Sequence, residues 1–146
     1  MPLHDVSSGY RTGDVLDYVE RTSNLTASTE ADWITGNSIL LSGNMAILLQ
    51  AFCAYADVPQ AGGIILRFYD GASALNRDAD FRLSSTGVGL QTTPIFPLLR
   101  ITPSAGFHTF KVTAALAGTG TAVLNAGAAS GGASTYAPAW LKVSVA

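Results

Sequence analysis

The sequence predicts an all-β protein, a jelly-roll-like antiparallel sandwich with an extended N-terminal arm. From residue 33 onward, apolar residues occur in runs of strand length, and within several runs they alternate with a period of two. Glycine, asparagine, aspartate and proline separate these runs at the short spacing that is typical of sandwiches and jelly rolls. No segment of useful length has the 3.6-residue period of a helix, so we expect one mostly β domain.

The expected strands follow one another along the body of the chain. They cover residues 33–42, 45–57, 63–69, 80–83, 95–102, 106–117, 121–126 and 139–145. Turns are predicted at the glycine-containing positions 43–44, 70–71 and 118–120, because glycine and its polar neighbours favour tight turns. In the run 106–117, we predict one shared face for the alternate residues His108, Phe110, Val112, Ala114 and Leu116. Residues 127–135, which are small and polar, are expected to form a surface loop.

Residues 1–32 differ from the rest of the chain in charge. They carry six acids and two arginines, a net charge of −4, whereas the remaining 114 residues have four acids and six bases, a net charge of +2. Their large apolar side chains are too few to offset a backbone ordering cost of about 1–2 kcal/mol per residue. We therefore expect an extended arm over residues 1–32 and a body over residues 33–146. Within the arm, a short helix is predicted over 13–21, with Asp14 as its N-cap.

The composition predicts burial against other chains. Hydrophobic residues make up 48% of the chain and charged residues only 12%, against about 25% charged in ordinary soluble domains. A small domain exposes much of its surface, so we expect an oligomer, specifically a homotrimer, whose arm holds a partner. The expected anchors of the arm are its larger apolar side chains and the residue at its boundary with the body: Tyr10, Val15, Leu16, Tyr18, Val19 and Trp33.

Several classes of protein are excluded at this stage. A net charge of −2 provides no electrostatic footprint for nucleic acid. The longest apolar run, residues 45–56, has 12 residues where a membrane helix needs about 20, so we expect no membrane span. Residues 1–32 lack an apolar signal segment, which predicts a protein made without secretion. One cysteine cannot form an internal disulfide, and a reducing compartment is expected.

Neither the cysteine nor the histidines predict catalysis. Cys53 lies in the middle of a predicted strand, where a free cysteine is a usual core residue, and we expect it to be buried and structural. His108 lies on a strand face beside apolar residues, and no serine occupies a nucleophile elbow. We expect His108 at a subunit contact or half-exposed at a strand end. The sequence predicts no catalytic residue, and we do not expect an enzyme.

Oxygen-rich loops hold calcium, and the acidic residues near position 80 are candidates for such a site. Asp78 and Asp80 are two residues apart, with Asp70 nearby, but calcium takes six to eight oxygen ligands. Arg77 and Arg82 are interleaved with them, which favours paired surface charges. The glycines at 118 and 120 begin a dinucleotide-binding pattern that lacks its third glycine and joins two strands. No metal and no cofactor are expected.

Two stretches and the general layout carry a resemblance to a known group. Residues 106–112, with the sequence GFHTFKV, and residues 139–145, AWLKVSV, occur in a β body that is poor in charge and follows a polar arm. This pattern resembles small trimeric virion proteins of tailed bacteriophages, and among them capsid decoration (cement or auxiliary) proteins. The resemblance implies a jelly-roll-like body that trimerises on the capsid exterior after synthesis in the host cytoplasm. It also implies an arm that reaches over the major capsid protein or a neighbouring copy.

A binding module of another class is the alternative. A receptor- or glycan-binding tip of a phage fibre or baseplate could have similar hairpins. Its sugar-stacking residues would come from the larger aromatic side chains, and the candidates are Trp33, Tyr69, Tyr136 and Trp140.

Overall fold

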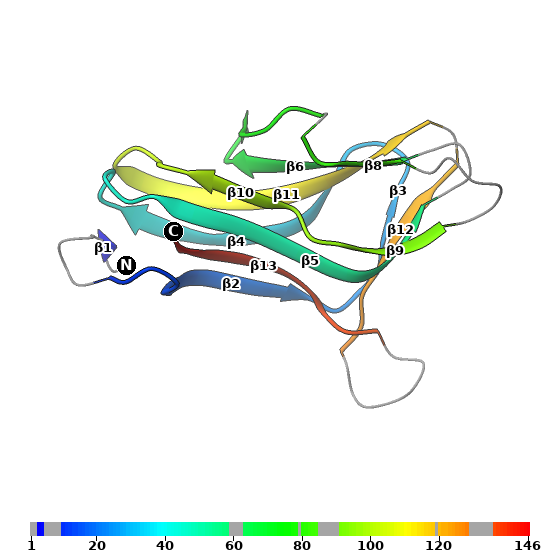
Figure 1. The fold of residues 1–146 in the computed structure, drawn as a ribbon, viewed down its shortest axis with the longest axis horizontal. Coiled ribbons are helices and arrows are strands. Elements are labelled where there is room, and N and C mark those ends of the chain that lie inside the picture. Colours follow the sequence, from blue (N-terminus) through cyan, green and yellow to red (C-terminus); the bar gives the residue numbers. More distant parts are fainter. Residues whose placement is uncertain are drawn as a thin grey trace.

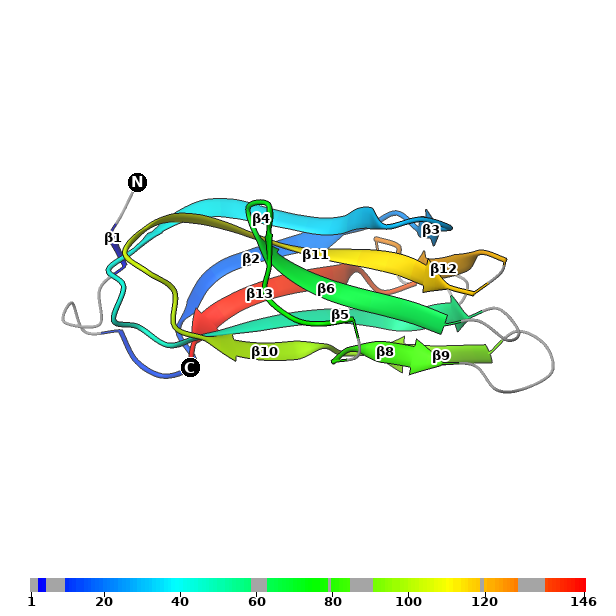
Figure 2. The same cartoon turned by 90° about the horizontal axis from the view of Figure 1, so that it is seen from above.

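The computed structural model is an all-β sandwich of two curled, largely antiparallel sheets, which confirms the predicted jelly-roll-like fold class (Figures 1 and 2). It describes residues 3–4, 10–58, 63–78, 80–84, 91–118, 120–128 and 136–146. Over these ranges, no helix has the length and apolar character needed to cross a membrane.

The first sheet is built around one long strand, β11 (Gly106–Ala117). This strand pairs antiparallel with β4 (Ala31–Leu41) on one side and with β6 (Gly63–Asp70) on the other. Short strands complete the sheet at its two edges. They are β1 (Leu3–His4), parallel to β4, and β7 (Ser73–Ala74) and β8 (Arg82–Ser84), both antiparallel to β6.

The second sheet is built around β5 (Ile47–Val58). The first half of β5 lies between β13 (Ala139–Val145) and β10 (Leu98–Ile101). Its second half lies between β12 (Ala122–Asn125) and β9 (Gln91–Ile95). The outer strands are β2 (Val15–Arg21), which pairs with β13, and β3 (Leu25–Ala27), which pairs with β12.

Alternation along the strands places the core between the two sheets. In β5, Ile47, Leu49, Ala51 and Cys53 are fully buried, whereas the residues between them are only partly buried. This is the period-2 pattern of a strand with one face on the core. The largest fully buried side chains include Trp33, Phe68 and Phe110, and each such burial contributes about 1.5–3 kcal/mol.

The structure corrects the expected arm. Residues 15–21 are a strand rather than a helix, and their pairing with β13 runs from Arg21 opposite Ala139 to Val15 opposite Ser144. The expectation failed because the surface that orders this segment is the edge of β13, in the same chain. The boundary at residue 33 is also wrong, since Trp33 lies inside β4 and in the core. Residues 1, 2 and 5–9 of the expected arm lie outside the described residues.

The sandwich is closed along the side where β2 faces β4. The backbone N–H of Asn37 donates to Asp17 Oδ2 over 2.7 Å, and its side-chain amide donates to Oδ1 over 2.8 Å. Gly36 permits this approach, because a Cβ atom there would lie 2.5 Å from Asp17 Oδ2. Arg21 adds a hydrogen bond of 2.8 Å to the carbonyl oxygen of Trp33. β2 is therefore an integral part of the fold.

Candidate interaction surface

Four aromatic side chains form a row across the outer face of the second sheet. Trp140 on β13 lies directly opposite Phe52 on β5, with ring centroids 5.6 Å apart and planes at 26°. Phe96, between β9 and β10, meets the Trp140 ring edge-on at 5.7 Å, and Tyr18 on β2 lies 6.1 Å away on the other side. Aromatic pairs at such separations contribute about 0.5–1.5 kcal/mol each beyond burial. We call Tyr18, Trp140, Phe52 and Phe96 the aromatic row.

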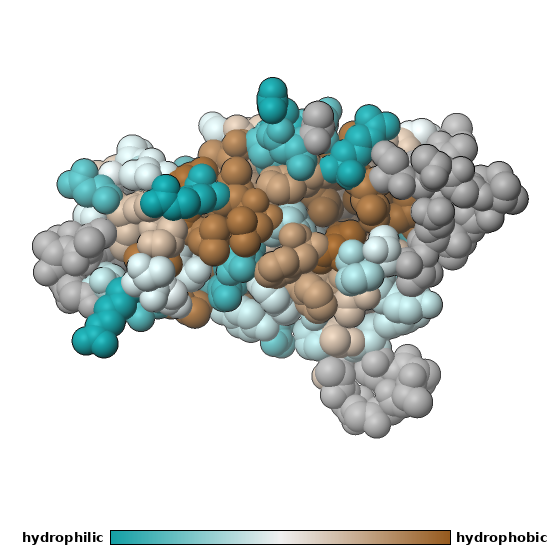
Figure 3. All heavy atoms as spheres, viewed as in Figure 1, coloured by the Kyte–Doolittle hydropathy of each residue, from teal (hydrophilic) through white to brown (hydrophobic). Residues whose placement is uncertain are grey.

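Further apolar groups lie beside the aromatic row. Leu98 on β10 is exposed and pairs with Gln50, whose other neighbour across the sheet is Lys142. Figure 3 shows hydrophobic residues gathered in a band over this part of the molecule. Among the described residues, seven large hydrophobic side chains are exposed. Six belong to strands of the second sheet or to the segments that flank them: Val15, Tyr18, Tyr55, Phe96, Leu98 and Tyr136.

The outer face of the first sheet has a different character, because it carries a network of charges and hydroxyls. Arg67 pairs with Glu30 over 2.5 Å and with Asp78 over 2.6 Å. The hydroxyls of Tyr69 and Thr113 donate to Glu30 Oε1 over 2.7 and 2.8 Å. A second ion pair, between Lys111 and Asp32, lies alongside at 2.8 Å. This face is therefore adapted to water, with Phe107 as its exposed large hydrophobic side chain.

The network perturbs the acid–base chemistry of its members. Burial raises the pKa of Glu30, but the hydrogen bonds from Tyr69, Thr113 and Arg67 outweigh it and hold the pKa below its ordinary value. The hydrogen bond to Glu30 raises the pKa of the Tyr69 phenol. Asp78 has a lowered pKa because Arg67 donates a hydrogen bond to its carboxylate. These directions describe a stable ionic network rather than a group adjusted for proton transfer.

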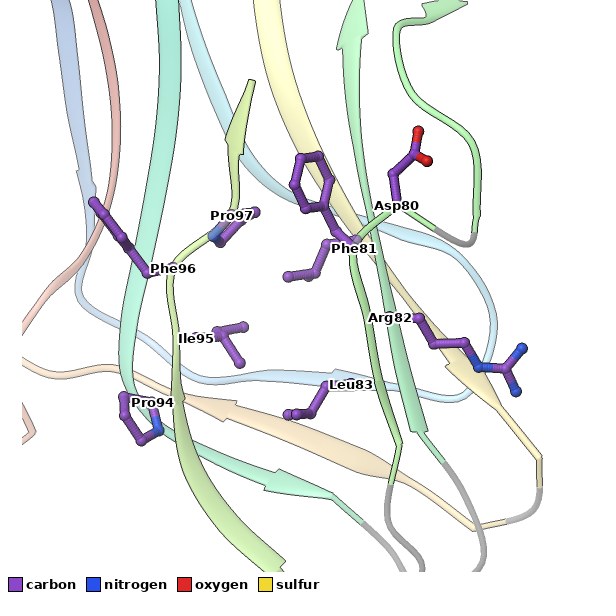
Figure 4. A pocket seen from close by; sticks show the side chains of 9 residues that line it. Asp80, Phe81, Arg82, Leu83, Pro94, Ile95, Phe96 and Pro97 are labelled. Carbon is purple, nitrogen blue, oxygen red and sulfur yellow. The ribbon is translucent and has the colours of Figure 1, made fainter. Parts of the chain in front are cut away.

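A shallow groove opens on the side opposite the β2–β4 closure. It has a volume of about 260 Å³ and lies between β8 and the β9–β10 segment. Figure 4 shows Leu83 and Ile95 pointing toward one another across it, while Asp80 and Arg82 point outward. In the same view, Phe96 points to the other side of its strand, toward the outer face of the second sheet. The groove and the aromatic row are thus separate features that share Phe96.

The structure separates the six expected anchors into three groups. Val15 and Tyr18 are exposed on β2, as a partner-binding residue must be, and the pKa of Tyr18 is raised by burial and by Glu20. Tyr10, Leu16 and Val19 are partly buried against the core of the same chain. Trp33 is 1% exposed, so its expected role as an anchor is wrong, as is any role in stacking on sugars.

Cys53 and His108 are both buried. The Cys53 thiol lies 3.4 Å from the carbonyl oxygen of Asn125, and burial raises its pKa, which confirms the expected buried cysteine. His108 is not half-exposed as expected, because its Nδ1 lies 2.6 Å from Asp70 Oδ2 and its Nε2 lies 2.8 Å from the Ser104 carbonyl oxygen. Both acceptors belong to the same chain, so His108 fastens the end of β6 to the loop before β11.

The three aspartates that are candidate calcium ligands have other partners. Asp78 pairs with Arg67, and Asp80 pairs with Arg77 over 3.0 Å. Asp70 lies beside His108. Of the two interleaved arginines that were expected as partners, Arg77 pairs with Asp80, whereas the partner of Asp78 is Arg67. Over the described part of the chain, no three or more His, Cys, Asp or Glu side chains gather in a way that could hold a metal ion.

Sequence reasoning found two members of the aromatic row and missed the other two. The sequence predicts Tyr18 as an anchor and Trp140 as a candidate for stacking on sugars, whereas no role is predicted for Phe52 or Phe96. A signal was present, because Phe52 lies between Ala51 and Cys53, which the strand period assigns to the core. What the sequence lacked was the order of the strands, which places β2, β13, β5 and β9–β10 side by side.

No family model matches the chain, and no curated protein matches it. Among solved structures, it is similar to a carbohydrate binding module from Cellvibrio mixtus lichenase 5A in complex with cellotriose, at 15% identity and a TM-score of 0.36, covering 92% of each chain. It is also similar to dimeric latent PorU from Porphyromonas gingivalis, at 11% identity and a TM-score of 0.37, covering 94% of this chain and 14% of that one.

Proposed function

We propose that the chain is a structural virion protein that binds the outside of a phage capsid as a trimer, and that the outer face of its second sheet docks on the major capsid protein. The observation that carries the docking surface is the contrast between the two outer faces. One face is a satisfied ionic network, and the other is an aromatic row with flanking exposed apolar groups. Contiguous apolar surface of this kind is typical of a protein interface. The capsid is proposed as the partner because the sequence resembles capsid decoration proteins.

The packing of the aromatic row favours a protein partner over a sugar. A sugar ring stacks on an open aromatic face, but Lys142 Nζ lies over the Trp140 ring at 5.7 Å, and Phe52 lies nearly parallel to the same ring. The Tyr18 hydroxyl already donates to Glu20 over 3.0 Å. The face therefore presents ring edges and aliphatic groups, which suit the apolar core of an interface between proteins. Glycan binding remains the alternative outcome of the test.

Binding to empty capsid shells that lack this protein tests the proposal. Phe96 is 52% exposed and lies outside the buried core, so Phe96→Ser removes an aromatic group from the row while the core side chains stay in place. The matched control is Phe107→Ser, since Phe107 is exposed on the first sheet. We expect Phe96→Ser to weaken co-sedimentation with the shells about tenfold or more, which corresponds to the loss of one interface anchor, and Phe107→Ser to have no effect.

Two results would overturn the proposal. Equal binding of both variants to shells would show that the aromatic row is not the docking surface. Binding of the intact chain to an immobilised polysaccharide, lost in Phe96→Ser, would show that the face takes a glycan instead.

A further inference from the structure

The cationic side chains differ in whether their own chain satisfies them. Three form ion pairs with carboxylates of the same chain: Arg67, Arg77 and Lys111. Arg21 donates to three backbone carbonyl oxygens. Two cations of the second sheet, Arg100 and Lys142, have neither kind of partner in the described part of the chain. Their charges are therefore available to a ligand.

Both of these cations lie on the outer face of the second sheet. Along β10, the residues on either side of Arg100 pack against the core, whereas Arg100 itself is exposed. Along β13, the residues on either side of Lys142 are buried. Because successive side chains of a strand point to opposite faces, both cations point away from the core. They therefore share the face that carries the aromatic row.

β5 lies between the two cations and brings them to the same part of this face. Lys142 is directly opposite Gln50, and Arg100 is opposite Leu48, two residues away along β5. Figure 2 shows β13, β5 and β10 side by side. Neighbouring strands are about 4.8 Å apart, so β10 and β13 are about 10 Å apart across β5. The Gln50 side chain has no hydrogen bond within the described residues, so its amide is a third available donor.

This part of the face carries no carboxylate. β10, β13 and residues 47–54 of β5 contain neither Asp nor Glu. An exposed acid is found on β2, where Glu20 is opposite Trp140, but its carboxylate accepts from the Tyr18 hydroxyl over 3.0 Å. Lys142 Nζ lies over the Trp140 ring, 5.7 Å from its centroid. The centre of the face is therefore positively charged as well as apolar.

We propose that Arg100 and Lys142 bind carboxylates of the partner, so that the segment docked on the second sheet is acidic as well as apolar. This inference rests on the proposed docking on the major capsid protein, and it names the chemistry of the part of that protein which is bound. Guanidinium and ammonium groups only donate hydrogen bonds, and an ionised carboxylate only accepts them. Leu98, which is exposed beside Arg100, and the aromatic row would contact the apolar side chains of the same segment.

The two charges also select against uncharged apolar partners. A segment without an acid would remove water from Arg100 and Lys142 and provide no acceptor in exchange, which costs free energy. A segment with Asp or Glu at these positions replaces the lost water by ion pairs. Apolar contacts around those pairs exclude water and strengthen them. The cations are therefore specificity residues of the docking face.

Single-stranded nucleic acid is another ligand that combines negative charge with aromatic contact. Its bases stack on open ring faces. Here Lys142 lies over the Trp140 ring, and Phe52 lies nearly parallel to the same ring, with planes at 26°. Because these neighbours occupy the ring, we favour carboxylates of a protein, and nucleic acid is an outcome of the test.

Carbodiimide cross-linking of the intact chain on empty capsid shells tests the contact directly. The reagent joins an amine to a carboxylate that touches it, and the chain has only two lysines, Lys111 and Lys142. Lys111 lies 2.8 Å from Asp32 and supplies the control product within the chain. We expect mass spectrometry to find Lys142 joined to an Asp or Glu of the major capsid protein. A Lys142–Glu20 product within the chain, without a link to the shell, would overturn the inference.

Charge reversal measures the contribution of Arg100. Arg100→Glu places a like charge against the proposed carboxylate, and we expect co-sedimentation with the shells to weaken about tenfold or more. Arg82→Glu is the matched control, because Arg82 is exposed on β8 of the first sheet, and it should change binding less than about twofold. Raising NaCl from about 50 to 500 mM should weaken binding of the intact chain more than that of Arg100→Glu, since salt screens the attraction.

The outcomes separate this inference from the proposed function. If Phe96→Ser weakens binding while Arg100→Glu and Arg82→Glu bind alike, the face docks on the shell and the inference alone is overturned. If neither Phe96→Ser nor Arg100→Glu weakens binding, the proposed function fails as well. Binding of an oligo(dT) strand to the intact chain, lost in Arg100→Glu, would overturn the inference by showing that the cations bind nucleic acid.

Discussion

The carboxylate of Asp17 on β2 bonds both the backbone and the side-chain amide of Asn37 on β4, at 2.7 and 2.8 Å. This contact joins the edges of the two sheets along one side of the sandwich. It also shows that the acidic N-terminal segment is held by the body of its own chain. Charges that suggested a free arm are, in the structure, partners of the core strands.

Removing this contact is expected to destabilise the fold. Asp17→Ala leaves the Asn37 N–H without its acceptor, and hydrogen bonds to charged groups contribute about 1.5–3 kcal/mol. We expect the free energy of unfolding in urea to fall by about that amount. Asp32→Ala is the control, because Asp32 is exposed and forms a surface pair with Lys111 that is worth about 0–1 kcal/mol. If Asp17→Ala and Asp32→Ala lowered the free energy of unfolding equally, the contact of Asp17 with Asn37 would not be what holds the two sheet edges together.

Deleting residues 1–30 is expected to unfold the body. The deletion removes β2 and β3, exposes the edge of β13, and uncovers core residues that Leu16 and Val19 cover. Circular dichroism should show loss of the β signal and of a cooperative thermal transition. A truncated chain with an unchanged transition would restore the interpretation of this segment as an arm.

The ionic network on the first sheet predicts a loss of stability in acid. The pKa of Glu30 is lower in the folded chain than its ordinary value, so its contribution is fully present above the ordinary value and is lost as the pH falls through the folded-state value. Glu30→Gln should therefore flatten the acid side of a stability–pH curve measured by urea unfolding. A variant curve parallel to that of the intact chain would contradict this assignment.

Cys53 is expected to be inert in the folded state. Its thiol is fully buried and has a raised pKa, so little thiolate is available, and alkylation should require unfolding. Cys53→Ala should lower the free energy of unfolding by about 1–2 kcal/mol through lost packing and leave partner binding intact. Rapid alkylation of the native chain, followed by mass spectrometry, would contradict the buried position.

The fold could be predicted from the sequence wherever alternation and turns agreed. The run 106–117 became β11, with Phe110, Val112 and Ala114 in the core as expected. The helix predicted over residues 13–21 is wrong, because a few polar and apolar residues after an N-cap residue fit a helix as well as a strand. Pairing with β13 decides between them, and that contact spans more than 100 residues of sequence.

The interaction surface was harder to predict for a related reason. Each member of the aromatic row lies alone in its own strand, and no local motif links Phe52 with Trp140. Their contact depends on the register between β5 and β13, which the sequence pattern does not define. Alternation along each strand predicts which residues are buried. Predicting which exposed side chains are neighbours on the outer face also requires the order of the strands.

Hydroxyl-radical footprinting of the chain, free and bound to capsid shells, tests the docking surface most directly. Phe96 and Phe107 are both exposed aromatic side chains, and they lie on opposite sheets. We expect oxidation of Phe96 to be suppressed on binding, while oxidation of Phe107 stays as in the free chain. Protection of Phe107 with continued oxidation of Phe96 would contradict the account, because the charged sheet would then be the face in contact with the shell.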